Sequence, residues 1–146
     1  MDGLTCPVEL NKKEYTRLFD DISYEKVVYG RLPMMITANC VKKTMGKCTG
    51  EKSEEYAVLT DRYQKKFPVK QNCAYCYNIV YNSVPLSLHK ELEKGVEYPM
   101  KRLVFTVENA EETKVVLNYY KSLSEGETTE LPFYEFTTGH EKRGVE

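Results

Sequence analysis

Four of the five cysteines in this chain lie close together in sequence, within residues 38–77. Seven residues separate Cys40 from Cys48, two separate Cys73 from Cys76, and 24 lie between the two pairs. Four thiolates suit either tetrahedral zinc or an iron–sulfur cluster, and the two-residue spacing lets two sulfurs converge from one tight turn. The sequence therefore predicts a four-cysteine metal or cluster segment that excludes Cys6.

Two other interpretations of these cysteines stay open. Free cysteine is among the most buried residue types, so some of the four could be ordinary core residues. A redox Cys-x-x-Cys of the thioredoxin type fits less well, because that motif begins a helix, whereas Cys76 leads into the β-branched and aromatic run Tyr77–Tyr81. Spacing alone does not separate zinc from iron–sulfur.

Length and charge favour one soluble domain, residues 1–146, with a single core. The chain has 146 residues, a formal net charge of −1 and 41% hydrophobic residues. This near-neutral charge argues against nucleic-acid binding over the whole surface, although residues 1–73, which hold four of the five cysteines, form the more basic half. No apolar run reaches membrane-spanning length and the N-terminus lacks a secretory layout, so we expect a cytoplasmic protein without a membrane partner.

Hydrophobic periodicity and capping residues predict alternating strands and helices. Helices are expected over residues 11–19 and 85–95 and from Asn109. Capping boxes are expected from Asn11 with Glu14 and from Asn109 with Glu112. The last helix should bury a stripe of Val116, Tyr119, Tyr120 and Leu123. Strands are expected at 26–29, 32–37, 77–81 and 102–107, and a hairpin at 56–60 and 66–70. Residues 41–55 are expected to form a surface loop and residues 125–146 a flexible tail.

This order favours an α/β fold. Repeated strand-then-helix units are typical of parallel sheets, but the chain is too short for a closed eight-fold barrel. We therefore expect a partial βα-barrel-like arrangement with a cysteine-rich loop and a small β-hairpin insertion.

Other chemical signals are weaker. Lysines and tyrosines around the cysteines could meet a phosphate backbone and stack bases, although most such residues are solvated or pack in strands. The spacing of the sequence pairs neither His89 nor His140 with a serine or cysteine nucleophile, so no catalytic residue is predicted. Asp61 and Arg62 could form a ligand clamp, but a structural turn is the favoured interpretation. The weak candidates for substrate or partner binding are Arg31, Asp61, Arg62, Lys66, Asn78 and Asn82.

Several motifs together resemble the peptidase U-thirty-two family, the collagenase-like proteases. They are the segments 30–35, 46–48, 59–63, 67–69, 73–78, 81–83 and 85–88, and the closing stretch 138–146. The resemblance implies proteolysis, without an agreed catalytic mechanism, and suggests the C-terminal part of a longer protein. Relatives that hydroxylate ubiquinone or transfer RNA hold a 4Fe-4S cluster on four cysteines, which implies Cys40, Cys48, Cys73 and Cys76 as ligands here.

Two functional hypotheses follow. The first is a collagenase-like peptidase region whose cysteines bind an iron–sulfur cluster, with zinc as the alternative. The second is a non-catalytic, metal-stapled module that binds RNA or a partner chain through the basic cysteine loop. Unpaired strand edges also predict self-association, or docking on a second polypeptide that supplies the rest of a barrel.

Overall fold

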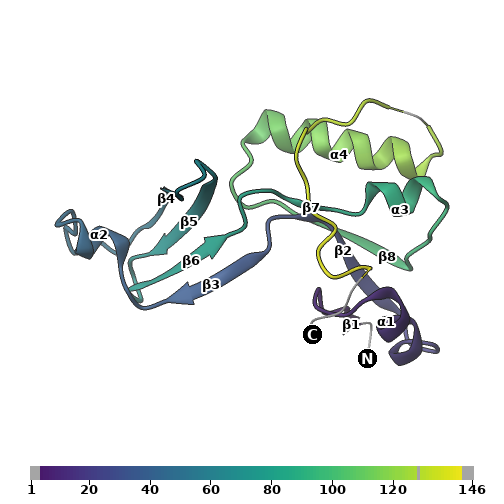
Figure 1. Ribbon diagram of the computed structural model, residues 1–146, viewed down its shortest axis with the longest axis horizontal. Helices are drawn as coiled ribbons and strands as arrows, with labels where there is room; N and C mark the ends of the chain where they lie inside the picture. The colour runs from purple at the N-terminus through teal and green to yellow at the C-terminus, as the bar shows by residue number, and fades with distance from the viewer. Residues whose placement is uncertain (1–3, 128, 143–146) are drawn as a thin grey trace. The chain divides into compact units, whose positions relative to one another are not determined.

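The chain divides into two compact units. The computed structural model describes residues 4–127 and 129–142, so residues 128 and 143–146 of the expected tail lie outside it. Unit 1 comprises Met1–Gly30 and Val84–Glu146, and unit 2 comprises Arg31–Ser83 (Figure 1). The sequence predicts one domain, whereas the structure forms two hydrogen-bonded sheets, one in each unit.

The sheet of unit 1 is built around β2 (Tyr24–Gly30). Along one edge of β2 runs the parallel strand β8 (Met100–Val104). Along the other edge lie β1 (Leu4–Thr5), which is parallel, and β7 (Leu86–Ser87), which is antiparallel. The sheet is therefore mixed, and the described strands include no closed barrel.

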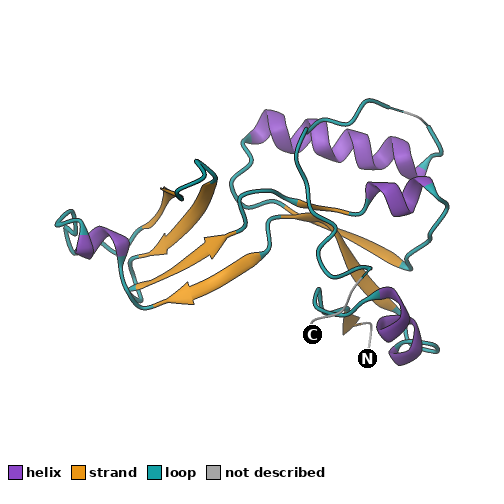
Figure 2. Cartoon of the chain, viewed as in Figure 1, coloured by secondary structure: helices purple, strands orange, loops and turns teal. Residues whose placement is uncertain are grey.

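Three helices accompany this sheet: α1 (Lys12–Leu18), α3 (His89–Glu93) and α4 (Ala110–Ser124), all purple in Figure 2. Both predicted capping boxes are confirmed. Asn11 and Asn109 each accept a hydrogen bond from the backbone N–H three residues on, and the glutamate there bonds back to the cap. The predicted buried stripe of α4 is also present, with Val116, Tyr119 and Tyr120 buried and Leu123 partly so.

Unit 2 is a four-stranded antiparallel sheet with the order β3-β6-β5-β4. Its strands are β3 (Pro33–Thr37), β4 (Glu54–Thr60), β5 (Lys66–Asn72) and β6 (Tyr77–Tyr81). The predicted hairpin is confirmed and is longer than expected, because the pairing of β4 with β5 extends to Glu54 and Asn72.

Three predicted elements differ from the structure. Residues 41–55 were expected to be a loop but include α2 (Val41–Thr44), where the Thr44 N–H and hydroxyl both donate to Cys40 O. The helix expected over 85–95 begins only at His89, because β7 pairs with β2 first. The strand expected to reach residue 107 ends at Val104, since the Glu108 carboxylate accepts the next N–H groups, at residues 106 and 107.

The described part of the expected tail packs on unit 1. Thr137 N donates to Pro85 O at 2.9 Å and Ser87 N donates to Thr137 O at 2.8 Å. The Phe136 ring lies 4.6 Å from the His89 ring. Residues 131–142 are thus tied to unit 1 by backbone pairing and ring contacts that a local sequence pattern does not reveal.

Among the described helices, none combines the length and apolarity that crossing a bilayer requires.

Candidate metal centre

All four clustered cysteines belong to connections at one end of the unit 2 sheet. The register places the end of β3 beside the start of β6, with Thr37 opposite Asn78. It also aligns the end of β5, at Asn72, with the starts of β4 and β6, at Glu54 and Tyr77. Cys40 follows β3, Cys48 precedes β4, and Cys73 and Cys76 link β5 to β6. The antiparallel topology therefore places two cysteine pairs that are distant in sequence at the same end of the sheet.

The segment from Cys73 to Cys76 forms the tight turn that its spacing predicts. Cys73 N donates to Ser53 O at 3.0 Å, which ties the turn to the residue just before β4. Cys76 has a left-handed backbone with φ of 54°, unusual for a residue with a side chain, and its thiol lies 3.9 Å from Cys73 O. The turn thus places the two thiols on one short reversal of the chain.

Asn78 fastens the Cys40 segment to this end of the sheet. Its side chain is fully buried, and Nδ2 donates to the carbonyl of Asn39 at 2.7 Å. The peptide just before Cys40 is thereby held against the start of β6, two residues after Cys76. Asn78 Oδ1 is buried and has no hydrogen-bond partner among the described residues. A buried acceptor without a donor is costly, so a ligand or an ordered loop at this position would relieve it.

An ion pair lies beside the same connections. Lys42 of α2 pairs with Glu55 of β4, and the Ser53 hydroxyl donates to the same carboxylate oxygen at 2.8 Å. The pairing raises the pKa of Lys42, chiefly through Glu55, and lowers the pKa of Glu55. Lys70 similarly pairs with Glu54 at 3.0 Å. These two lysines, which belong to the basic stretch around the cysteines, are thus already partnered by carboxylates.

The four thiols are chemically suited to bind a metal, but among the described residues they do not form a closed ligand group. The four thiols are free, with Cys48 and Cys76 exposed and Cys40 and Cys73 partly buried. Among the described residues, no three cysteine, histidine or acidic side chains are grouped closely enough to hold a metal ion. Thiols on three adjacent connections still supply the soft ligands that zinc or an iron–sulfur cluster takes. Ligation would require the connections to close on one another.

The weak candidates for partner binding do not join the cysteines, apart from Asn78. Arg31 Nη1 donates to Asn82 O at 3.0 Å and to Ser83 O, so these residues brace the chain where β3 begins and β6 ends. The carboxylate of Asp61 accepts the N–H groups of residues 63 and 65, at 2.8 and 2.9 Å, which is the turn-forming role. Arg62 and Lys66 lie in the same hairpin turn region, at the end of the strands away from the cysteines.

A serine–histidine contact occurs in unit 1, but its hydrogen-bond direction excludes nucleophile activation. Tyr120 OH donates its single hydrogen to Val28 O, so the Ser87 hydroxyl, 2.7 Å away, must donate to Tyr120. Ser87 Oγ therefore accepts from His89 Nδ1 at 2.7 Å, the reverse of general-base activation. Both side chains are buried, and burial lowers the pKa of His89.

Three residues that organise the cysteine connections were not predicted from the sequence. Asn39 supplies the carbonyl that Asn78 holds, Ser53 supplies the carbonyl for Cys73, and Glu55 pairs with Lys42. Two of these contacts are made by backbone carbonyls, which carry no sequence signal.

Comparisons of the chain with protein-family models, with curated proteins and with solved structures found no match.

Proposed function

We propose that unit 2 is a four-thiolate metal- or cluster-binding module in a chain that resembles the collagenase-like peptidases. The observation that carries this proposal is the sheet register, which gathers the three cysteine-bearing connections at one end. Cys40, Cys48, Cys73 and Cys76 are the ligands. When bound, an iron–sulfur cluster supplies redox or Lewis-acid chemistry, whereas zinc supplies a structural staple.

The residues around the thiols hold and orient the connections. Asn78 fixes the peptide before Cys40, and the Cys73 N–H bond to Ser53 fixes the start of the Cys73–Cys76 turn. The Lys42–Glu55 pair anchors α2, which follows Cys40, to β4. Contacts of this kind determine how well ligating side chains are presented, and losing one typically costs 10- to 100-fold in metal affinity.

The test is metal analysis after anaerobic purification of the wild type, Cys76→Ser and Cys6→Ala. We expect stoichiometric iron and sulfide, or one zinc, in the wild type and in Cys6→Ala, and its loss in Cys76→Ser. Cys6 is the matched control because it is a thiol of unit 1, outside the cysteine connections. Absence of metal from the wild type, or its retention in Cys76→Ser, would contradict the proposal.

Peptide hydrolysis is part of this proposal through the family resemblance. The mixed sheet of unit 1, with β1 and β8 parallel to β2, is compatible with one part of a βα barrel completed by a second polypeptide or a second copy. We also propose a cytoplasmic, reducing location, which keeps the thiols available. Cleavage of collagen-like peptides that is lost together with the metal would support peptidase activity, and metal-independent cleavage would separate the two roles.

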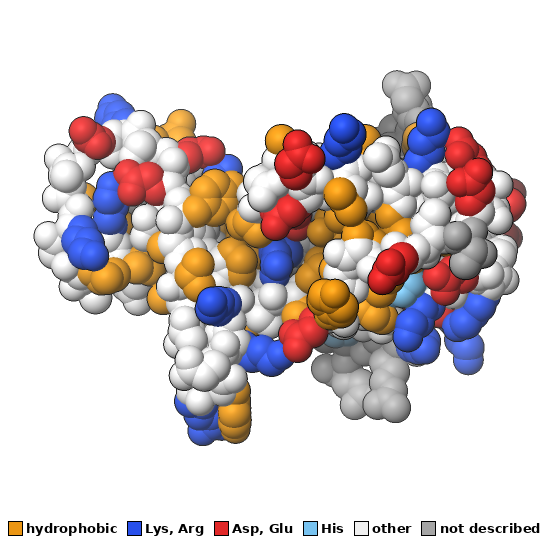
Figure 3. Space-filling model, turned by 90° about the horizontal axis from the view of Figure 1, so that it is seen from above, with side chains coloured by type: hydrophobic (Ala, Val, Ile, Leu, Met, Phe, Trp, Pro, Cys, Tyr) orange, Lys and Arg blue, Asp and Glu red, His pale blue; other side chains and the backbone are white. Residues whose placement is uncertain are grey.

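A second candidate function is binding of RNA or a partner chain without catalysis. Exposed tyrosines favour it: Tyr56, Tyr63 and Tyr75 are 52%, 70% and 79% exposed. The Arg62 guanidinium stacks 4.7 Å from the Tyr63 ring centroid. Basic and hydrophobic side chains both reach the surface of unit 2 (Figure 3). Cations beside an exposed ring suit a single-stranded nucleic acid.

Salt dependence separates this function from the first. We expect binding of single-stranded RNA to weaken with salt and to fall in Tyr63→Ala and Arg62→Ala, while Lys114→Ala in α4 of unit 1 serves as the charge control. RNA binding without hydrolysis of peptides would favour the module interpretation. Binding that Lys114→Ala weakens as much as Arg62→Ala would indicate only general charge attraction.

A further inference from the structure

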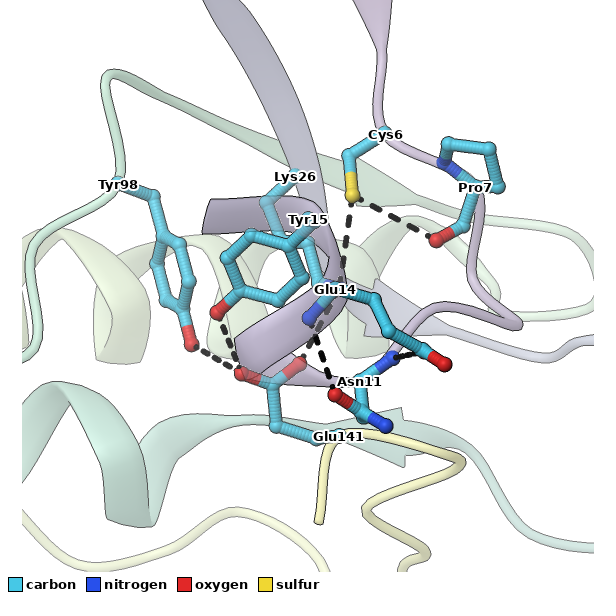
Figure 4. Close-up of polar contacts among 8 residues, drawn as sticks. All are labelled: Cys6, Pro7, Asn11, Glu14, Tyr15, Lys26, Tyr98 and Glu141. Carbon is cyan, nitrogen blue, oxygen red and sulfur yellow. Dashed lines mark hydrogen bonds and ion pairs between the residues drawn. The ribbon is translucent and has the colours of Figure 1, made fainter. Parts of the chain in front are cut away.

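Unit 1 holds a buried polar cluster that the proposed function does not use (Figure 4). Its members come from segments far apart in sequence, and none is more than 5% exposed. They are Cys6, Tyr15, Lys26, Tyr98 and Glu141. A buried lysine and a buried carboxylate are rare unless they are paired, so this cluster requires an explanation.

Lys26 is the centre of the cluster. Its Nζ lies 3.1 Å from Glu141 Oε2 on one side and 3.7 Å from Cys6 Sγ on another, as the dashed lines of Figure 4 show. It also lies 4.0 Å from the centroid of the Tyr15 ring. The ε-amine is therefore held between a thiol that can be oxidised and a carboxylate that can take a proton from it.

Packing prevents these groups from turning to other partners. Cys6 is 0% and Lys26 2% exposed, and Cys6 N is fixed to Glu25 O at 2.8 Å. Cys6 is the only cysteine in the sequence of unit 1, so no disulfide partner exists within this unit. The nearest partner for an oxidised Cys6 sulfur is therefore the amine of Lys26.

We propose that Cys6 and Lys26 are a covalent modification site, at which a peroxide oxidant joins Sγ to Nζ through one oxygen atom. Lys26 first passes a proton to Glu141, which leaves a neutral amine beside the thiol. One hydrogen peroxide converts the thiol to a sulfenic acid and a second converts the amine to a hydroxylamine, and each step releases one water. Condensation of the two products forms the S–O bond of an N–O–S bridge and releases a third water.

The balance identifies what is oxidised. Sulfur and nitrogen lose two electrons each, and the two peroxides are reduced to water. The remaining atoms are conserved, because a thiol, an amine and two peroxides give the bridge and three waters. The thiol reacts slowly, since burial raises the pKa of Cys6 even though Lys26 acts in the opposite direction. The contact with the Lys26 amine compensates for this slow reaction, because the amine that must join the oxidised sulfur is already in place.

The bridge would change how unit 1 is held together. The nitrogen of the bridge is no longer an ammonium, so Glu141 loses its cation, while the residue 6 segment becomes covalently tied to β2. The hold on the C-terminal segment would weaken and the hold on the N-terminal segment would strengthen. Oxidation would thus shift the connection between the two ends of the chain.

Tryptic mapping of the 146-residue chain after hydrogen peroxide treatment tests the proposal. We expect peptide 1–12 to be linked to peptide 18–31, with cleavage after Lys26 lost and a mass equal to the two peptides plus one oxygen minus two hydrogens. Dithiothreitol should reverse the link and restore cleavage after Lys26. The link should be absent from Cys6→Ala and from Lys26→Arg, which keeps a cation beside Glu141.

Other outcomes overturn the proposal. They are an unmodified Cys6, a sulfinic or sulfonic acid at Cys6 with normal cleavage after Lys26, or a disulfide from Cys6 to one of the other four cysteines. The wild-type mass and its reversal by dithiothreitol decide the matter even if Lys26→Arg fails to fold. Cys48, which is exposed, serves as the internal control for irreversible oxidation. The result is independent of metal binding by unit 2.

Discussion

Glu141, close to the C-terminus, forms an ion pair with Lys26 on β2, with 3.1 Å between Oε2 and Nζ and each side chain only 3% exposed. Its other oxygen accepts hydrogen bonds from Tyr15 OH at 2.7 Å and Tyr98 OH at 3.2 Å. Lys12 N in α1 also donates to Glu141 O at 3.1 Å. One residue therefore joins the last described segment to α1, β2 and the chain before β8.

Replacing Glu141 by alanine should strongly destabilise unit 1. The substitution leaves the buried Lys26 ammonium without its carboxylate, and breaking a buried pair from one side costs about 3–5 kcal/mol. The free energy of unfolding from urea titration measures this loss. Glu91→Ala is the control, because its partner Lys94 is 61% exposed, and such surface pairs contribute about 0–1 kcal/mol. Equal losses in the two variants would contradict the prediction.

Gly30 at the end of β2 should not tolerate a side chain. Its φ is +145°, and a Cβ there would lie 2.5 Å from Val104 O and 2.8 Å from Val104 Cβ. Gly30→Ala should cost more than Gly95→Ala, where φ is +78° and nothing lies within 4 Å. The backbone conformation at Gly95 alone costs about 1–2 kcal/mol, and crowding at Gly30 adds about 1–3 kcal/mol. A thermal melt that ranks the variants the other way would refute this account.

Stability should fall as the pH drops below 6.5 because of His89. Burial lowers the pKa of His89 from its usual 6.5, so the unfolded chain takes up this proton at a higher pH than the folded chain. The contribution is present above pH 6.5 and is lost as the pH falls toward the folded pKa. His89→Gln, whose amide can still donate to Ser87, should flatten urea midpoints measured from pH 7.5 to 5, and His140→Gln is the control. An unchanged slope in His89→Gln would exclude this residue as the cause.

Alkaline pH should also destabilise unit 1, through its buried tyrosines. Burial raises the pKa of Tyr119 to about 12, and it raises the pKa values of Tyr15, Tyr98 and Tyr120 as well. The unfolded chain releases these protons near pH 10, so stability is complete below pH 10 and declines as the pH rises toward the folded values. Tyrosinate absorbance followed alongside circular dichroism should show ionisation and unfolding together. In Tyr119→Phe the decline should be smaller.

Asn78 should affect metal binding more than Asn72, the last residue of β5. Asn78→Ala removes the hydrogen bond to Asn39 O that holds the Cys40 segment, and we expect metal affinity to fall about 10- to 100-fold. Cobalt(II) or zinc titration measures it. Asn72→Ala is the matched control, because the Asn72 amide donates to the Tyr77 hydroxyl at 3.1 Å, and the bond from Tyr75 N to Asn72 O is a backbone contact that the substitution keeps. Similar affinities in both variants would exclude this role for Asn78, whereas no binding by the wild type would reject the metal proposal itself.

Local patterns were sufficient where a few neighbouring residues decide the structure. The capping boxes at Asn11 and Asn109 are complete within four residues, so both helix starts could be predicted. The β4–β5 hairpin and the Cys73–Cys76 turn are likewise short-range features. Spacing thus identified the turn that presents two of the candidate ligands.

The candidate site as a whole depends on pairings between distant strands. That Cys40 lies at the same end of the sheet as Cys76 follows from the register of Thr37 with Asn78, which no local pattern contains. Asn78 was a weak candidate in the sequence, but its role as the residue that holds Asn39 O is visible only in the structure.

Local sequence patterns were enough to predict where α1 and α4 begin, where the Cys73–Cys76 turn lies and which thiols are near one another in the chain. The burial of Glu141 against Lys26 and the hydrogen bond from His89 to Ser87 are visible in the folded chain alone. The physical reason is that capping and turn formation are satisfied within a few residues. The burial of a charge or a hydroxyl depends on partners that folding brings from the other end of the chain.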